Sequence, residues 1–167
     1  RVPLSSTALT GTATCAWSTS STNSASGGVQ CWGTGPSSQP PASFAAAVTD
    51  IVGGTNHACA LLADRSVRCW GEDRQYNVYA ADPANYAGPI PKGSAAVAPA
   101  GLSDVQQIIA GDDYACALKT DGTLACWGSN RNAVFAPAGV TGDRLFGDHE
   151  APPCLRRATT RAIECWG

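Results

Sequence analysis

Eight cysteines, which occur in pairs within a repeated sequence motif, constrain the fold of this chain more than any other feature of its sequence. The motif is clearest at residues 56–71 and 114–128, where an apolar run with one cysteine leads through a polar turn to Cys-Trp-Gly. Weaker copies lie at residues 15–33 and 154–167. Two short apolar runs around a polar turn are typical of a β-hairpin. The sequence therefore predicts a series of hairpins, each carrying two cysteines.

Each hairpin is expected to hold its own disulfide. If Cys116 lies opposite Cys126, residues 120–122 form a three-residue loop with Gly122 at the place that favours a left-handed backbone. Opposed residues of an antiparallel pair are close enough for a disulfide. Zinc is the alternative, but there is no Cys-x-x-Cys pair and only two histidines are present. The predicted pairs are Cys15–Cys31, Cys59–Cys69, Cys116–Cys126 and Cys154–Cys165.

The turns of the other copies differ from that of the third. Arg65 takes the place of Gly122 in the second copy, which costs about 1 kcal/mol in a left-handed backbone or requires another turn type. The last hairpin needs a loop with an even number of residues around Thr159 and Thr160. Because side chains alternate along a strand, the Trp after each second cysteine points away from the disulfide. We expect these residues to pack between neighbouring blades: Trp32, Trp70, Trp127 and Trp166.

The repeats recur at intervals of about 40 residues, a period that is typical of β-propellers. We expect one repeat domain over residues 1–167, with repeats at about 1–33, 44–71, 102–128 and 140–167. The longer middle interval contains an insertion at residues 76–99. The predicted fold is an all-β propeller with about four blades, either small, partial or open.

The repeated motif resembles the repeat of the regulator of chromosome condensation superfamily. The resemblance lies in Gly-x-x-His-x-Cys-Ala-Leu, an Asp-Gly turn and the following Cys-Trp-Gly. The cysteines make it similar to the crinkly-type repeats of plant receptor-kinase ectodomains and of many secreted proteins. The match is strongest over residues 54–71 and 111–128 and partial over 11–33 and 147–167. The resemblance implies a seven-bladed propeller. This chain has fewer repeats and lacks the Gly-Gln-Leu-Gly phrase after Trp-Gly, so a part of a larger ring, a four-bladed ring and an open array all stay possible.

The sequence offers no catalytic set, and we expect no cofactor and no metal. His57 aligns with Tyr114, and His149 falls in the same turn of the last copy, a recurrence that favours hydrogen bonds between blades over catalysis. The turns before the hairpins carry polar residues that could gather on one rim as a weak calcium or polar-ligand site. Solvated turns are the favoured interpretation, because no calcium-loop spacing is present. The candidate rim residues are Asn56, Asp112, Asp113, Asp148 and Glu150.

The insertion is the best candidate for an interaction loop, because tyrosine gives a large contact area for little entropy. Its tyrosines are Tyr76, Tyr79 and Tyr86, and the alternative is a loop that packs on its own blade. Four disulfides favour an extracellular protein, secreted or on the cell surface. The net charge of −2 gives no reason to expect nucleic acid, and no apolar run is long enough to enter a membrane.

We therefore predict a module that binds a protein or glycan, or a structural subunit that assembles with further copies of itself. A receptor ectodomain, a surface fibre and a wall protein all belong to this class. The Ser-, Thr- and Pro-rich segments at residues 18–26 and 36–43 could carry O-linked sugars. The alternative is a secreted carbohydrate-active enzyme that uses acidic residues on one rim. A nuclear exchange factor is disfavoured by the paired cysteines.

Overall fold

Short antiparallel strands make up almost all of the regular structure. The computed structural model describes residues 6–11, 13–18, 28–71, 97–128, 136–148 and 151–167, and within these it has twelve strands and one 3-10 helix, η1 (Pro36–Ser38). Each run of three strands forms one antiparallel sheet in chain order. The strands are β1 (Ser6–Leu9), β2 (Ala13–Trp17), β3 (Gln30–Gly33), β4 (Val48–Gly53), β5 (His57–Leu62), β6 (Val67–Gly71), β7 (Val105–Ala110), β8 (Tyr114–Lys119), β9 (Leu124–Gly128), β10 (Gly142–Phe146), β11 (Cys154–Arg157) and β12 (Ile163–Cys165).

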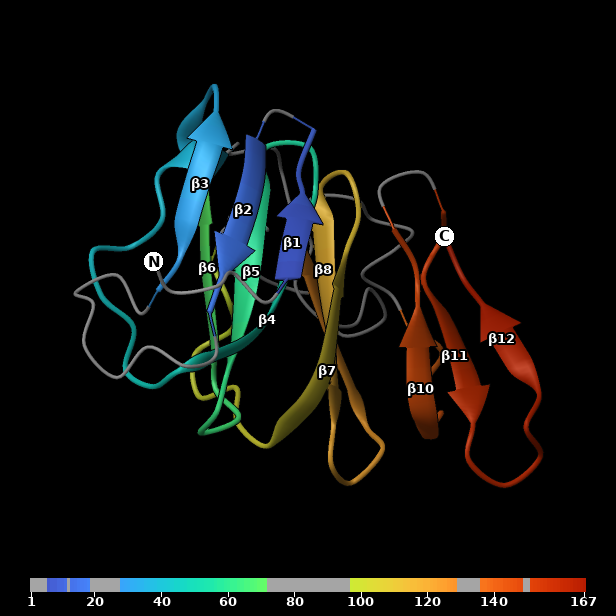
Figure 1. The fold of residues 1–167 in the computed structure, drawn as a ribbon. Helices are drawn as coiled ribbons and strands as arrows, with labels where there is room; N and C mark the ends of the chain where they lie inside the picture. Colours follow the sequence, from blue (N-terminus) through green and yellow to red (C-terminus); the bar gives the residue numbers. More distant parts are fainter. Residues whose placement is uncertain (1–5, 12, 19–27, 72–96, 129–135, 149–150) are drawn as a thin grey trace, which may run out of the picture.

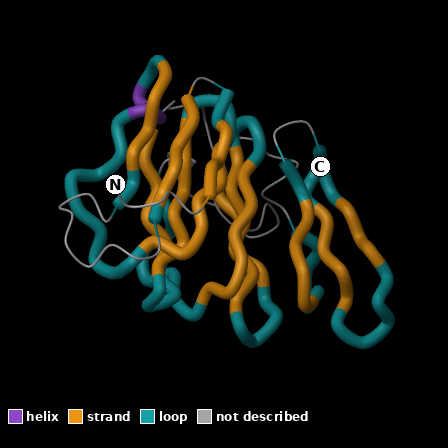
Figure 2. Tube along the Cα trace, in the orientation of Figure 1, coloured by secondary structure: helices purple, strands orange, loops and turns teal. Residues whose placement is uncertain are grey.

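The four sheets follow one another across the molecule, from β1–β3 near the N-terminus to β10–β12 near the C-terminus (Figures 1 and 2). The first strands of the sheets are neighbours: β1 contacts β4, β4 contacts β7, and β7 contacts β10. The sheets therefore turn the same edge toward a common side and stack face to face. No helix in the described part of the chain is long and apolar enough to cross a bilayer.

The predicted register is confirmed in each hairpin. Cysteines lie directly opposite each other in the last two strands of every sheet and form the four expected disulfides. The same register places Trp70 opposite Ala58 and Trp127 opposite Ala115. The prediction of an all-β fold with one disulfide per hairpin is therefore confirmed.

The hairpin turns show how local chemistry sets this register. Gly122 has φ 84°, and Arg65 takes the equivalent left-handed conformation with φ 65°. In both turns an aspartate one position earlier accepts hydrogen bonds from the backbone N–H and the hydroxyl two residues later. The last hairpin closes through residues 158–161, an even number as predicted, with Arg161 left-handed at φ 60°.

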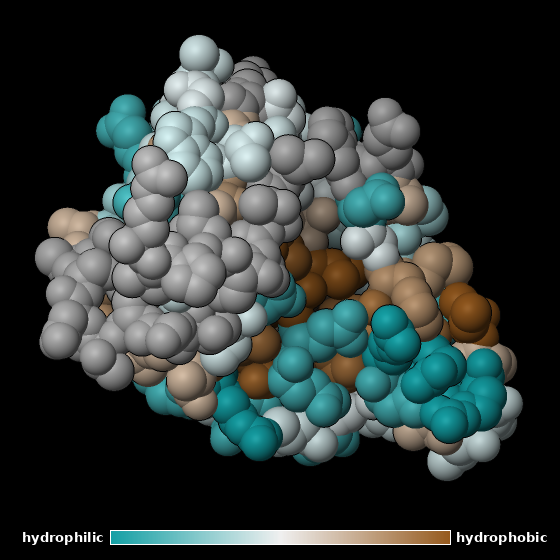
Figure 3. All heavy atoms as spheres, viewed as in Figure 1, coloured by the Kyte–Doolittle hydropathy of each residue, from teal (hydrophilic) through white to brown (hydrophobic). Residues whose placement is uncertain are grey.

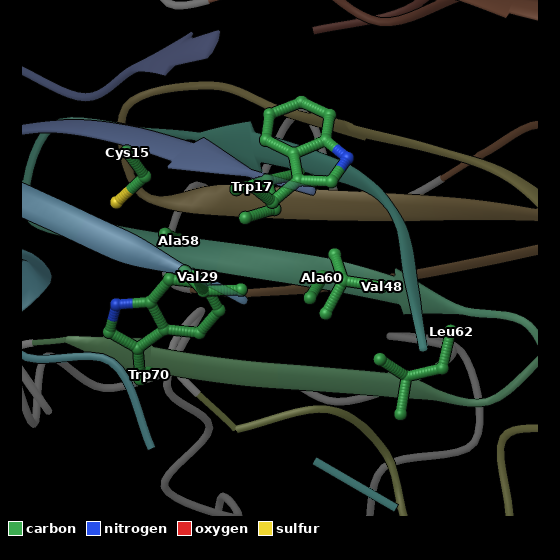
Figure 4. Close-up of a cluster of buried hydrophobic side chains, with 9 residues drawn as sticks. Cys15, Trp17, Val29, Val48, Ala58, Ala60, Leu62 and Trp70 are labelled. Carbon is green, nitrogen blue, oxygen red and sulfur yellow. The ribbon is translucent and has the colours of Figure 1, made fainter. Parts of the chain in front are cut away.

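Three hydrophobic clusters fill the spaces between successive sheets. Figure 4 shows the first of them, in which Trp17 of β2 and Trp70 of β6 lie among small and branched residues of the first two sheets. The Trp70 indole N–H donates to the Ser37 carbonyl at 2.9 Å, and the Phe44 ring meets Trp70 edge-on with centroids 6.0 Å apart. The segment after β3 therefore helps to close this cluster.

The four repeated tryptophans do not all pack in the same way. Trp70 and Trp127 are buried, and Trp166 is partly buried against the third cluster. Trp32 departs from the predicted packing, because 51% of its surface is exposed. The physical reason is its position: β1–β3 is the first of the four sheets, and no described sheet precedes it.

Candidate interaction surfaces

Each sheet has two chemically different faces, since side chains alternate along a strand. We call the face that carries the two cysteines the disulfide face and the opposite one the tryptophan face. In β4–β6 the hydrophobic residues of the disulfide face are Val52, Cys59, Leu61, Val67 and Cys69, and those of the tryptophan face are Ile51, Ala58, Ala60, Leu62 and Trp70.

The stacking rule is the same at all three internal interfaces. The disulfide face of one sheet packs on the tryptophan face of the next, so Trp70, Trp127 and Trp166 share a cluster with the disulfide of the preceding sheet. A large ring with a small opposed residue presents a broad apolar surface, and the disulfide and its branched neighbours cover it. Stacking in one direction leaves one face of each kind at the two ends.

The disulfide face of β10–β12 is uncovered in the described structure. Phe146 is 36% exposed and Ile163 is 62% exposed, and Cys165 is exposed as well. The register places Phe146 at the position of Ile109 in the preceding sheet, and Ile163 at that of Leu124. Those two residues belong to the cluster that β10–β12 covers. We call the set Arg144, Phe146, Cys154, Arg156, Ile163 and Cys165 the open disulfide face.

Two arginines, Arg144 of β10 and Arg156 of β11, lie side by side on this face. The Arg144 guanidinium lies 5.4 Å from the centre of the Phe146 ring, within cation–π range. Arg156 and Arg161 both pair with Asp143, and the Arg156 hydrogen bond is the main reason that the pKa of Asp143 is lowered. In Figure 3 hydrophobic surface (brown) lies above a hydrophilic area (teal) at the side where Figure 1 places β10–β12.

The tryptophan face of β1–β3 is the second end surface. Thr14 pairs with Trp32 there, and Ala16 pairs with Gln30. Ala16 is buried, whereas Gln30 and Trp32 are exposed, so the uncovered part of this face lies along β3. The described sheets therefore leave one disulfide face and one tryptophan, Trp32, exposed. In the other three sheets the corresponding tryptophan is packed against the disulfide face of the preceding sheet.

The polar turns between the first and second strands form contacts between sheets. The Thr55 hydroxyl donates to Asp112 Oδ1 at 2.6 Å, and the Thr55 N–H donates to the Asp112 carbonyl at 3.3 Å. Asp148 Oδ1 accepts from the Ala151 N–H at 3.0 Å within its own turn. These carboxylates hold the turns of the stack in place. Among the residues that the structure describes, no three carboxylate, histidine or thiol groups are grouped as a metal site would require.

The aligned pair at the start of the second strands is buried. The Tyr114 hydroxyl donates to the Ala151 carbonyl of the next sheet at 3.0 Å, which is the predicted role of this position. Burial raises the pKa of Tyr114 to about 12, and the charges of Asp148 and Asp112 act in the same direction. His57 is also buried, its Nε2 has no hydrogen-bond partner, and burial lowers its pKa to about 4.

The remaining candidate residues divide between described and undescribed parts. Asn56 and Asp113 are half-buried in their turns. Tyr76, Tyr79, Tyr86, His149 and Glu150 lie outside the described residues.

Sequence reasoning missed the contributions of Trp17 and Gln107. Trp17 follows the first cysteine of its copy rather than the second, so the repeat pattern gave no signal for it. Gln107 donates from Nε2 to the Leu145 carbonyl and accepts the Leu145 N–H at Oε1, both at 2.8 Å. The Gln107 side chain thus forms with Leu145 the pair of hydrogen bonds that a backbone residue forms with its partner in a neighbouring strand, and it links β7 to β10.

Comparisons with known proteins agree with this geometry. The family model of the regulator of chromosome condensation (RCC1) repeat matches residues 48–76 and 105–133, which contain the second and third sheets. Protein pim1 of Schizosaccharomyces pombe is 32% identical over 97 residues, which is 51% of this chain and 17% of that protein.

Two receptor-kinase ectodomains have a similar structure over 98% of this chain. The entire ectodomain of CR4 from Physcomitrella patens aligns with a TM-score of 0.66 at 22% identity, and the CRINKLY WD40 ectodomain of ACR4 from Arabidopsis thaliana with 0.64 at 25%. This chain spans 40% and 50% of their respective lengths. The four sheets are thus blades of a partial propeller of this type.

Proposed function

Because the chain carries regulator of chromosome condensation (RCC1) repeats on disulfide-stapled propeller blades, we propose that it is an extracellular module that binds another protein. Its end surfaces, and the tyrosine loop at residues 76–99, are the proposed contact regions. Binding to glycans through the same surfaces, and a role as a structural subunit of a fibre, wall or receptor, belong to this proposal. So does attachment of O-linked sugars to its Ser-, Thr- and Pro-rich segments.

The disulfides support the extracellular location. All eight cysteines are paired, and such bonds persist in oxidising compartments and are rare in the cytosol and nucleus. The two receptor-kinase structures that cover nearly the whole chain are ectodomains. Both observations favour a secreted or surface protein over a nuclear exchange factor.

The open disulfide face is the observation that carries the binding proposal. Phe146 and Ile163 together leave an apolar patch beside the Arg144 and Arg156 guanidiniums. Aromatic, aliphatic and arginine side chains in one patch are the composition typical of protein interfaces. An enzyme that uses the rim receives less support, because Asp112 and Asp148 already accept hydrogen bonds from Thr55 and Ala151.

A binding screen with the purified, oxidised chain tests the proposal. The chain is applied to a panel of extracellular protein domains and to a glycan array, and the same chain pretreated with dithiothreitol is the control. We expect saturable binding to at least one protein, lost after reduction. A chain that binds neither panel, or that hydrolyses a polysaccharide and loses this activity with Asp112→Asn, would contradict the proposal.

A further inference from the structure

We propose that His57 is an acid-sensitive contact between the second blade (β4–β6) and the third (β7–β9): when its imidazole takes up a proton, the turns that meet there separate, while the contact between the third and fourth blades stays closed. Both blades lie inside the described chain, so this contact is internal and independent of what the chain binds. We call the place where residues 54–57 meet residues 111–114 the His57 contact, and the place where Tyr114 meets Ala151 the Tyr114 contact.

The two rings occupy the same position in successive blades. His57 begins β5 and Tyr114 begins β8, and each ring lies against the glycine three residues before it. A Cβ on Gly54 would be 2.2 Å from His57 Cε1, and a Cβ on Gly111 would be 2.0 Å from Tyr114 Cε1. The Cβ on Gly54 would also be 2.0 Å from the Gly111 carbonyl oxygen. Glycine therefore lets the imidazole and the backbone of the third blade approach closely.

The hydrogen bonding of the two rings differs. The Tyr114 hydroxyl donates to the Ala151 carbonyl of the next blade at 3.0 Å. His57 is only 2% exposed, and its Nε2 has no hydrogen-bond partner among the described residues. In the imidazolium both nitrogens carry a proton, so Nε2 becomes a charged donor without an acceptor. Burying such a donor is strongly unfavourable, and water reaches it when the two turns separate.

The inner strands add a second difference between the two pairs of blades. Gln107 of β7 makes two hydrogen bonds with the backbone of Leu145 and so ties the third blade to the fourth. The register places Asp50 of β4 at the position of Gln107, and Asp50 accepts instead from the Ile51 N–H of its own strand at 2.9 Å. A carboxylate cannot donate, so Asp50 does not reproduce the Gln107 pair. The second and third blades are thus the pair more easily separated at this edge.

Burial rather than a charged neighbour controls the titration of His57. Burial lowers the pKa of His57 to about 4, and a hydrogen bond with the Tyr114 backbone acts in the opposite direction. Charged side chains do occur on the elements around it: Asp50 on β4, Arg68 on β6, Lys119 on β8, and Asp112 and Asp113 in the facing turn. The Asp112 carboxylate accepts the Thr55 hydroxyl at 2.6 Å and so already has a partner in the contact.

Acid favours the open form of the His57 contact by linkage. The imidazole has a pKa of about 4 while it is buried and its ordinary value of 6.5 once water reaches it. The open form therefore binds a proton more tightly, and the opening equilibrium grows as the pH falls from 6.5 toward 4. Between pH 7 and pH 5 it should rise about twentyfold. Carboxylates with ordinary pKa values stay mostly charged at pH 5, so a change in this window belongs to the histidine.

Amide hydrogen exchange of the full, oxidised chain tests the proposal, read residue by residue at pH 7 and pH 5 and corrected for intrinsic rates. The Thr55 N–H reports on the His57 contact, because it donates across it to the Asp112 carbonyl at 3.3 Å. The Leu145 N–H, which donates to Gln107, reports on the contact between the third and fourth blades. The variant is His57→Gln, which does not titrate. His149→Gln is the matched control, since the chain has two histidines.

We expect protection of the Thr55 N–H to fall about twentyfold from pH 7 to pH 5 in the wild type and in His149→Gln, while that of the Leu145 N–H stays constant. His57→Gln should show no such fall. Constant Thr55 protection in the wild type, an equal fall at Leu145, or a fall that persists in His57→Gln overturns the proposal. Should His57→Gln not fold, the wild-type profile decides alone: Thr55 protection must begin to fall near pH 6.5 and level off below pH 4.

Discussion

Replacing Gln107 with alanine should loosen the contact between the third and fourth blades. The Gln107 amide makes two hydrogen bonds of 2.8 Å with the backbone of Leu145, and the site is partly buried. A typical hydrogen bond contributes about 0.5–1.5 kcal/mol net, so losing both should lower the free energy of unfolding by about 1–3 kcal/mol. The Leu145 N–H and C=O lose their partners on β7, which places the effect at the inner edge of the stack.

The neighbouring glutamine provides a matched control. Gln106 donates only from Nε2 to the Lys119 carbonyl at 2.9 Å, and this site is exposed. Gln106→Ala should therefore cost no more than about 0.5 kcal/mol. Urea unfolding without reductant compares the two variants, and amide hydrogen exchange follows the Leu145 N–H directly. Equal stabilities for the two variants, with unchanged exchange at Leu145, would refute the view that this side chain joins the blades.

Three further predictions concern groups inside single blades. His57 has a pKa of about 4 in the folded protein, below its unfolded value of 6.5, because burial disfavours the charged imidazole. This difference contributes to the free energy of unfolding. The contribution is complete above pH 6.5 and is lost as the pH falls toward 4. The loss should reach about 3 kcal/mol, and His57→Phe should remove this pH dependence from urea midpoints measured across the window. The Cys154–Cys165 disulfide should be the first to be reduced by mild dithiothreitol, because Cys165 is exposed whereas each of the other three disulfides includes a fully buried cysteine. Mass-spectrometric mapping of alkylated thiols measures the order of reduction. Arg65→Gly should raise the thermal midpoint by relieving about 0.5–1 kcal/mol of left-handed strain, whereas Gly122→Arg should lower it; equal shifts of one sign would contradict this.

Stacking in one direction has a consequence for how such a chain can interact. Every internal interface uses one disulfide face and one tryptophan face, so an open stack always ends in two unlike surfaces. A disulfide joins directly opposed residues in each hairpin, including that of β11 and β12. Phe146 and Ile163 are exposed on the disulfide face of β10–β12, which no other described sheet covers.

The cysteine spacing and turn residues alone determined the hairpins. Cys116 and Cys126 are ten residues apart around a turn with Gly122, and a register set by so few residues leaves a single pairing. The same reasoning predicted the even-numbered loop of the last hairpin, and it left two alternatives at Arg65, of which the structure has the left-handed one. These properties are local, and local chemistry is visible in a sequence.

Only the tertiary structure decided which residues join the blades and which stay exposed. Trp17 is buried and Trp32 is half exposed, although of these two residues the repeat pattern singled out only Trp32 for packing. Gln107 meets Leu145 across 38 positions of the chain, and Asp112 meets Thr55 across 57. Contacts of this kind depend on how one sheet packs on the next. Residues from segments far apart in the sequence determine this packing jointly, so a local sequence pattern does not reveal it.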